Sequence, residues 1–195
     1  MAGSDSRYPA SMSRASAGSP VQPTAPWRWE LPQIQSVVNQ IRAGRDLTPK
    51  QWPNGSRVAV TLSFDMDAET GFLTFGNSSP QALSRGEYGP RRGIPRILRL
   101  LERHRIPATF FVPAISGQLH PDAVDAILSA EPKHEIGVHG WLHERITELD
   151  PQEERALTFR AFEWWTGRLG HKPRGIRTTS WDFTPETTGD RKSVV

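Results

Sequence analysis

The stretch EIGVHGWLH, residues 135–143, places two histidines directly after a short apolar run. The run at 135–138 is typical of a buried strand. At helical spacing His139 and His143 would share one face, and two imidazoles four residues apart commonly bind zinc. Position 140 is glycine, which excludes the His-Glu-x-x-His motif of helix-borne metalloproteases. Two isolated histidines are more often incidental, but their place after a strand favours a ligand role.

A second motif, LSFDMD at residues 62–67, ends another apolar run. If the strand continues, Asp65 and Asp67 point the same way, because residues two apart lie on one face. Two carboxylates held close together favour a neighbouring cation. At this point two interpretations are equally open: a cation site, or two solvated carboxylates at a strand end.

Between these motifs the pattern alternates between strand and helix, which predicts an α/β protein with parallel βαβ units. Strands are expected at 57–64, 108–112, 135–138 and 175–178; helices at 31–43, 94–104, 121–130 and 151–169; and a long loop at 71–93. In such folds functional groups gather at the carboxyl ends of strands. Asp65, His139 and Arg177 all follow predicted strands. We expect the remaining histidines, His104, His120, His134 and His171, to lie on the surface.

Composition narrows the class of protein. The chain has 195 residues and no cysteine, so one domain is expected, and a metal would need histidine and carboxylate ligands. Its net charge is +3, but the basic residues are scattered among 21 acids, which argues against a nucleic-acid partner. No apolar run suggests a signal peptide or membrane span, so we expect a cytoplasmic protein with no membrane partner. Oligomeric state is not readable from the sequence.

Three motifs in order resemble those of the polysaccharide deacetylases, which share the NodB-homology fold. They are SFDMDAE at 63–69, HGWLH at 139–143 and GIRTTSWDFTP at 175–185, with TFFV at 109–112 and GEYG at 86–89 fitting the same pattern. The spaced Asp-Met-Asp is similar to the branch that contains peptidoglycan-deacetylase-like and allantoinase-like proteins. The resemblance covers roughly residues 52–187.

The resemblance implies a role for each motif residue. Asp67, His139 and His143 would bind a divalent metal, with zinc as the default and cobalt, nickel or iron also compatible with these ligands. Asp65 would be the catalytic base, and Arg177 would orient it.

The resemblance also implies a substrate pocket, lined by Trp181, Glu69 and Tyr88. The substrate would be an N-acetylated glycan, such as peptidoglycan or a chitin-like oligomer. Small linear or cyclic amides are the alternative, favoured by the expected absence of a signal peptide. A third possibility is an inactive fragment, because no residue here matches the family's general-acid histidine.

The implied fold is a truncated, incomplete (β/α) barrel, since a full barrel needs ~250 residues. We expect a disordered Ser/Ala/Pro-rich tail at 1–26, a helical lead-in at 27–51 and a partial deacetylase domain at 52–189. Residues 190–195, DRKSVV, back-translate to a common sequencing-adapter string, which predicts that they are not native. Different codons in the nucleotide record would contradict that prediction.

Overall fold

The computed structural model describes residues 25–39, 46, 48–184 and 186–187. The expected disordered tail therefore lies almost wholly outside the described residues, and the expected non-native residues 190–195 lie outside them entirely. The chain divides into two compact units, Met1–Ser56 and Arg57–Val195.

The described part of the first unit is built around one short helix. Gln33 Oε1 accepts a hydrogen bond from the backbone N–H of Glu30 at 2.9 Å, and this contact caps the amino end of the helix. The sequence predicts the helix over 31–43; it covers 31–38 here, while 40–43 lie outside the described residues. None of its side chains is buried. The described elements of the unit are η1 (Pro26–Arg28), α1 (Leu31–Val38) and η2 (Pro53–Gly55).

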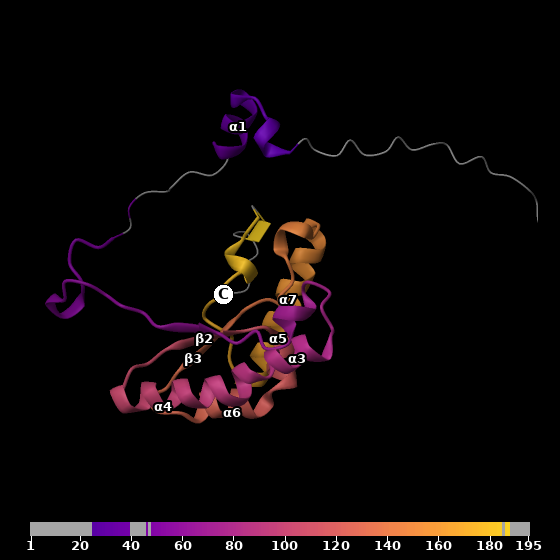
Figure 1. The fold of residues 1–195 in the computed structure, drawn as a ribbon. Coiled ribbons are helices and arrows are strands. Elements are labelled where there is room, and N and C mark those ends of the chain that lie inside the picture. The colour runs from indigo at the N-terminus through magenta and orange to yellow at the C-terminus, as the bar shows by residue number, and fades with distance from the viewer. Residues whose placement is uncertain (1–24, 40–45, 47, 185, 188–195) are drawn as a thin grey trace, which may run out of the picture. The chain divides into compact units, whose positions relative to one another are not determined.

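Three parallel strands form the sheet of the second unit, in the order β1-β2-β3 (Figure 1). The strands are β1 (Ser63–Asp65), β2 (Thr109–Val112) and β3 (Glu135–Val138). A bridge joins Val138 to Ile176, so the fourth predicted strand has one paired residue. The α/β class and the parallel arrangement predicted from the sequence are confirmed.

The first predicted strand, over 57–64, is paired only near its end. The ladder begins where Thr109 N donates to Leu62 O at 3.1 Å. Just upstream of β2 the chain turns at Arg105, whose φ is +52°. Among the described residues no strand pairs with 57–61, and Val60 is 81% exposed. The apolar residues of 57–64 favoured a strand, but a strand forms only where its backbone can pair with a neighbouring strand.

Helices pack with β2 and β3 around one hydrophobic core. The helices from residue 94 to residue 169 are α4 (Ile94–His104), α5 (Ala114–Leu119), α6 (Pro121–Ser129) and α7 (Pro151–Leu169), with a short turn η4 (Ile146–Glu148) before α7. Helices α4 and α6 lie side by side (Figure 1). The start of α7 is as predicted: Asp150 Oδ1 accepts the N–H groups of Gln152 and Glu153, each at 2.9 Å. Gly170, with φ of +75°, ends it.

The stretch 71–93, predicted as a loop, is largely helical. The elements here are α2 (Thr70–Leu73), α3 (Pro80–Gly86) and the π-helical turn η3 (Gly89–Gly93). The prediction was wrong because the stretch lacks apolar periodicity, although Ser79 followed by Pro80 is a helix start. Ser79 Oγ accepts the N–H of Ala82 at 3.3 Å. Gly86 allows α3 to pack closely against the segment that follows β1, because a Cβ at position 86 would lie only 2.7 Å from Glu69 Cα.

The core lies on one face of the sheet. Phe110 and Val112 of β2 and Trp165 of α7 are fully buried, and Trp165 Nε1 donates to Val112 O at 3.0 Å. Alternate residues of β2, Thr109 and Phe111, are only partly buried, because successive side chains point to opposite faces. In β1 the same alternation directs Phe64 to the core and Ser63 and Asp65 to the second face.

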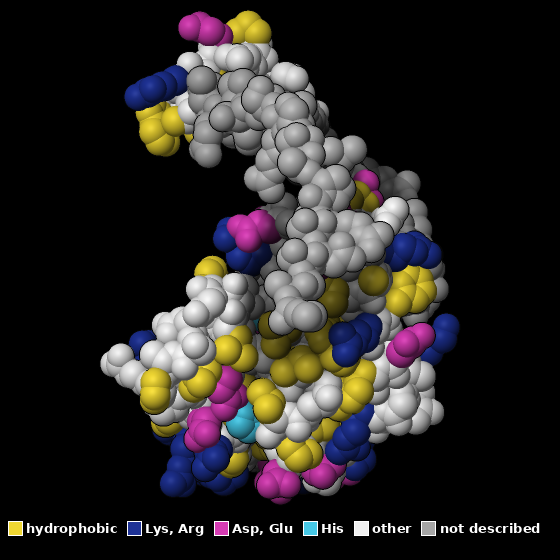
Figure 2. All heavy atoms as spheres, turned by 90° about the vertical axis from the view of Figure 1, so that its right-hand side faces the viewer, with side chains coloured by type: hydrophobic (Ala, Val, Ile, Leu, Met, Phe, Trp, Pro, Cys, Tyr) yellow, Lys and Arg dark blue, Asp and Glu magenta, His cyan; other side chains and the backbone are white. Residues whose placement is uncertain are grey.

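The surface mixes apolar and charged groups. On the face drawn in Figure 2, hydrophobic side chains gather in the middle, and acidic and basic side chains alternate along the lower edge. No helix among the described residues is long and apolar enough to cross a membrane.

Candidate metal centre

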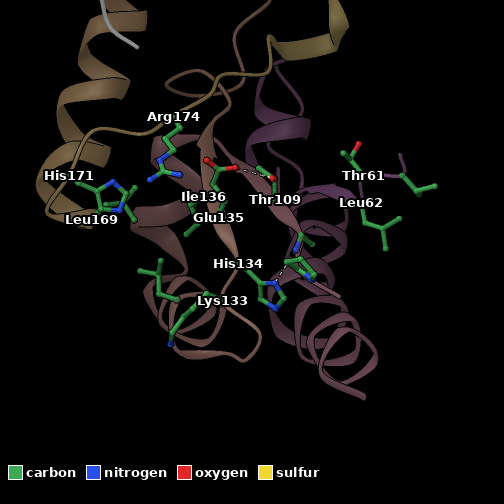
Figure 3. Close-up of a pocket in the computed structure, with 14 residues that line it drawn as sticks. Thr61, Leu62, Thr109, Lys133, His134, Glu135, Ile136, Leu169, His171 and Arg174 are labelled. Atoms are coloured by element: carbon green, nitrogen blue, oxygen red, sulfur yellow. Dashed lines mark hydrogen bonds between the residues drawn. The ribbon is translucent and has the colours of Figure 1, made fainter. Parts of the chain in front are cut away.

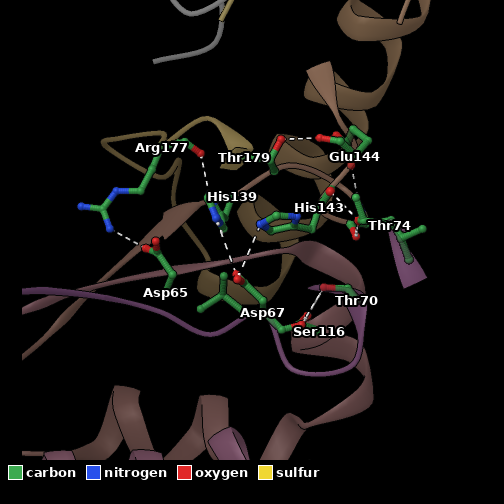
Figure 4. Close-up of polar contacts among 12 residues, drawn as sticks. Asp65, Asp67, Thr70, Thr74, Ser116, His139, His143, Glu144, Arg177 and Thr179 are labelled. Atoms are coloured by element: carbon green, nitrogen blue, oxygen red, sulfur yellow. Dashed lines mark hydrogen bonds and ion pairs between the residues drawn. The ribbon is translucent and has the colours of Figure 1, made fainter. Parts of the chain in front are cut away.

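Three side chains able to bind a metal lie together beyond the carboxyl ends of β1 and β3 (Figure 4). One ligand atom from each of Asp67, His139 and His143 lies within 4.8 Å of the others. Asp67 Oδ1 is 3.5 Å from His139 Nε2, and Asp67 Oδ2 is 3.5 Å from His143 Nε2. Ligands ~2.1 Å from a tetrahedral zinc lie about 3.4 Å from one another. The spacing therefore fits a bound ion better than direct hydrogen bonds.

His139 follows β3 directly and is 1% exposed. Its Nδ1 donates to the backbone oxygen of Arg177 at 2.8 Å, which leaves the Nε2 lone pair directed at Asp67. Burial lowers the pKa of His139 below the usual 6.5, and this outweighs the backbone hydrogen bond and nearby carboxylates that raise it. The neutral imidazole is the form that binds a metal.

His143 reaches the cluster through a folded turn and not along a helix. Gly140 has φ of +76° and His143 has φ of +72°. The carboxylate of Glu144 accepts the N–H groups of Trp141 and Leu142, the latter at 2.8 Å. The turn brings the two imidazole rings to 5.0 Å between centroids, at 80° to each other. Glycine at 140, the residue that broke the helix pattern, supports this geometry.

The donor set fits a divalent metal. Asp67 Oδ1 and His143 Nδ1 are buried without a hydrogen-bond partner among the described residues. A buried, unpaired carboxylate oxygen is costly unless a cation satisfies it. Two imidazole nitrogens and one carboxylate are ligands typical of zinc and related divalent metals, in the three-ligand form that leaves a position open.

Beside these three side chains lies an ion pair between Asp65 and Arg177. Arg177 Nη1 donates to Asp65 Oδ1 at 2.5 Å, and Nη2 donates to Ser63 Oγ at 2.6 Å. The guanidinium lies between two rings, 4.2 Å from the centroid of Phe111 and 4.5 Å from that of Trp181. These contacts fix the plane of Arg177. Ser63 and Phe111 were missed from sequence, although Ser63 lies two residues before Asp65 on the same face.

Gly137 of β3 makes room for this stack. A Cβ at position 137 would lie 2.5 Å from Phe111 Cε1, and the ring is held in place under Arg177. We expect Gly137→Ala to lower the free energy of unfolding in urea by about 1–3 kcal/mol, as overpacking does. Gly167→Ala in α7 is the control, because nothing lies within 4 Å of its Cβ position; it should stabilise by up to ~1 kcal/mol. Equal stability of the two variants would contradict the close packing.

The three residues expected to line a substrate pocket, Trp181, Glu69 and Tyr88, each lie in a different environment. Trp181 stacks on Arg177 and is 72% exposed. Glu69 pairs with His120, with 2.7 Å between Oε2 and Nε2, and both side chains are mostly buried. The prediction that His120 lies on the surface was therefore wrong; its carboxylate partner, 51 positions away, gave no local signal. Tyr88 is 58% exposed and precedes η3.

Two hollows of similar size border the sheet at opposite ends. One, of ≈ 560 Å³, is lined by residues at the amino ends of the strands, including Thr61, Thr109 and Glu135 (Figure 3). It contains none of the three metal-binding side chains. The other, of ≈ 500 Å³, is lined by Asp65 and Asp67 and by residues of α3, η3 and α4. The smaller hollow borders the two carboxylates Asp65 and Asp67, but His139, His143 and Arg177 are not part of its lining.

The chain is similar to known proteins over most of the second unit. The family profile described as polysaccharide deacetylase matches residues 73–193, which include His139, His143 and Arg177. A peptidoglycan deacetylase of Helicobacter pylori is 31% identical over 129 residues, or 65% of this chain and 43% of the relative. The chain thus spans less than half the length of that curated relative.

Two solved structures share the fold and are more than 25% identical to this chain over the aligned residues. A Mycobacterium smegmatis protein assigned to the polysaccharide deacetylases is 35% identical, with a TM-score of 0.67 over 76% of this chain and 53% of its own. Puue allantoinase is 26% identical, with a TM-score of 0.63 over 77% of this chain and 57% of its own. The chain spans just over half of each structure.

Proposed function

The chain belongs to the polysaccharide deacetylase family, as its motifs predicted, and from this premise we propose that it is a metal-dependent hydrolase that removes N-acetyl groups from amino-sugar polymers. Members of this family hydrolyse C–N bonds other than peptide bonds. One arrangement carries the proposal: the buried cluster of Asp67, His139 and His143 next to the Asp65–Arg177 ion pair. It combines a cation site with a second carboxylate outside the cluster, Asp65, which can act as a base in metal-assisted hydrolysis.

Each residue of the site has a proposed role. Asp67, His139 and His143 would hold the cation, with zinc proposed because three protein ligands of these types are typical of catalytic zinc. Bound there, a divalent cation supplies Lewis-acid activation of water and of the amide carbonyl. Asp65 acts as general base and takes a proton from the water that attacks the carbonyl carbon. Arg177 holds the carboxylate of Asp65 in one orientation through its Nη1 contact.

The substrate we propose is an N-acetylated glycan of the peptidoglycan type, since the Helicobacter pylori relative is a peptidoglycan deacetylase. Trp181 supports this choice, because its exposed ring beside Arg177 offers an apolar face at the edge of the site. The similarity to Puue allantoinase favours a second candidate, hydrolysis of small linear or cyclic amides at the same cluster.

Metal content and activity, measured on the same preparation, test the proposal. We expect about one divalent ion per chain by elemental analysis, and release of acetate from N-acetylglucosamine oligomers or peptidoglycan fragments. Removing the ion with a chelator should reduce the rate at least ~100-fold, and added zinc should restore it.

The outcomes separate the candidate functions. Hydrolysis of allantoin without acetate release from glycans would favour the small-amide function. A bound ion without hydrolysis of either substrate would identify an inactive metal-binding chain. A chain that binds no ion but remains folded would overturn the metal-dependent function.

A further inference from the structure

The backbone oxygen of Asp67 is the meeting point of several hydrogen-bond donors. Thr70 Oγ1 and Ser116 Oγ each lie 2.6 Å from it, and Thr70 N lies 3.1 Å from it. Thr70 begins α2, while Ser116 lies in α5, 46 positions further along the chain. Figure 4 shows Thr70 and Ser116 next to Asp67, with a dashed line joining their two hydroxyls. The main chain at Asp67 is thus hydrogen-bonded to α5, the helix that follows β2 in the sequence.

Both hydroxyl residues are fully buried, with 0% of their surface exposed. A buried hydroxyl is unfavourable unless it is hydrogen-bonded, so its partner shows what it contributes. The two hydroxyl oxygens are 2.9 Å apart, and each carries one hydrogen. If one hydroxyl donates to the other, the second still donates to Asp67. In every arrangement at least one of them holds the Asp67 carbonyl.

These backbone hydrogen bonds matter because one carboxylate oxygen of Asp67, Oδ1, has no hydrogen-bond partner among the described residues that would fix its direction. The next residue, Ala68, has φ of +52°, a left-handed conformation that alanine rarely adopts. The direction of the carboxylate is therefore set through the backbone, by the bonds that stabilise this turn.

We propose that Thr70 and Ser116 are positioning residues of the metal site, which hold the Asp67 turn so that its carboxylate faces the two histidines before an ion arrives. The inference rests on the proposed function, because it requires Asp67 to be a ligand. Neither hydroxyl touches the metal or substrate; each acts through the backbone of Asp67. Groups that orient ligands in this way typically change metal affinity 10–100-fold when removed.

The test measures Co²⁺ affinity of the 195-residue chain by competition with a chromophoric chelator, and the visible spectrum of bound Co²⁺. We expect Ser116→Ala and Thr70→Val to weaken Co²⁺ binding about 10–100-fold and to alter the spectrum. Thr70→Ser, which keeps the hydroxyl, should restore both. The matched control is Thr166→Val in α7, whose hydroxyl donates to Phe162 O at 2.7 Å outside the site; its affinity should equal that of the unaltered chain.

The outcomes also distinguish this inference from the proposed function. If the unaltered chain binds no Co²⁺, the proposed function itself fails. If it binds Co²⁺ and both hydroxyl-free variants bind it equally well with the same spectrum, the positioning role is overturned. Ser116→Ala removes one atom from a helix, so it carries the test even if Thr70→Val fails to fold. A weakened affinity without rescue by Thr70→Ser would also overturn the role of the Thr70 hydroxyl.

Discussion

Replacing Asp67 with asparagine should abolish stoichiometric metal binding and reduce kcat/KM for amide hydrolysis at least about 10³-fold. In the proposed metal site this carboxylate is the anionic ligand; its Oδ1 lies 3.5 Å from His139 Nε2 and its Oδ2 lies 3.5 Å from His143 Nε2. Losing it removes several kcal/mol of transition-state stabilisation, and each 1.36 kcal/mol corresponds to a factor of ten in rate. Asparagine keeps the size of the side chain, so the fold should survive. Metal content, kcat/KM and the far-ultraviolet circular dichroism spectrum are the measurements.

A matched control separates the loss of this ligand from the loss of any surface carboxylate. Asp122→Asn in α6 removes an exposed acid away from the cluster and should leave both metal content and rate unchanged. Full metal occupancy in the Asp67→Asn variant would show that the ion binds elsewhere, and the assignment of all three ligands would fall with it.

Replacing Asp65 with asparagine should have a different signature: hydrolysis reduced about 10²–10⁴-fold, with metal content unchanged. This range is typical for removing a general base. Asp65 Oδ1 is engaged by Arg177 at 2.5 Å, and the metal-binding cluster comprises Asp67, His139 and His143. The measurement pairs kcat/KM with elemental analysis of the same sample. Loss of the ion on Asp65→Asn would make Asp65 a ligand and leave the site without its proposed base.

The parts of the fold that were predicted well are those with a strong local signal. Helix α7 has an N-cap at Asp150, a proline in its first turn and a glycine at its end, and it spans the predicted residues. Strand β3 matches the prediction at both ends. It pairs with β2 on one side and, through Val138, with Ile176. The strand predicted over 57–64 is confirmed only at its end, where Ser63 and Phe64 pair with β2, because pairing depends on where β2 begins, which no residue in 57–64 encodes.

The site shows the same division between local and distant information. Asp67, His139 and His143 were named from motifs, and the structure brings them together. Thr70 and Ser116 were missed because their partner is a backbone oxygen, which every residue has. A hydroxyl aimed at a main-chain atom leaves no mark in spacing or composition, so only the three-dimensional arrangement reveals it.

Arg177 contacts both Asp65 and His139, one with its side chain and the other with its backbone. Its side chain holds Asp65, while its backbone oxygen accepts the hydrogen of His139 Nδ1. Its own N–H donates to Val138 O, so the residue docks onto the end of β3. The proposed base Asp65 and the proposed ligand His139 are therefore both held by Arg177, so we expect a shift of the segment around 177 to displace both side chains.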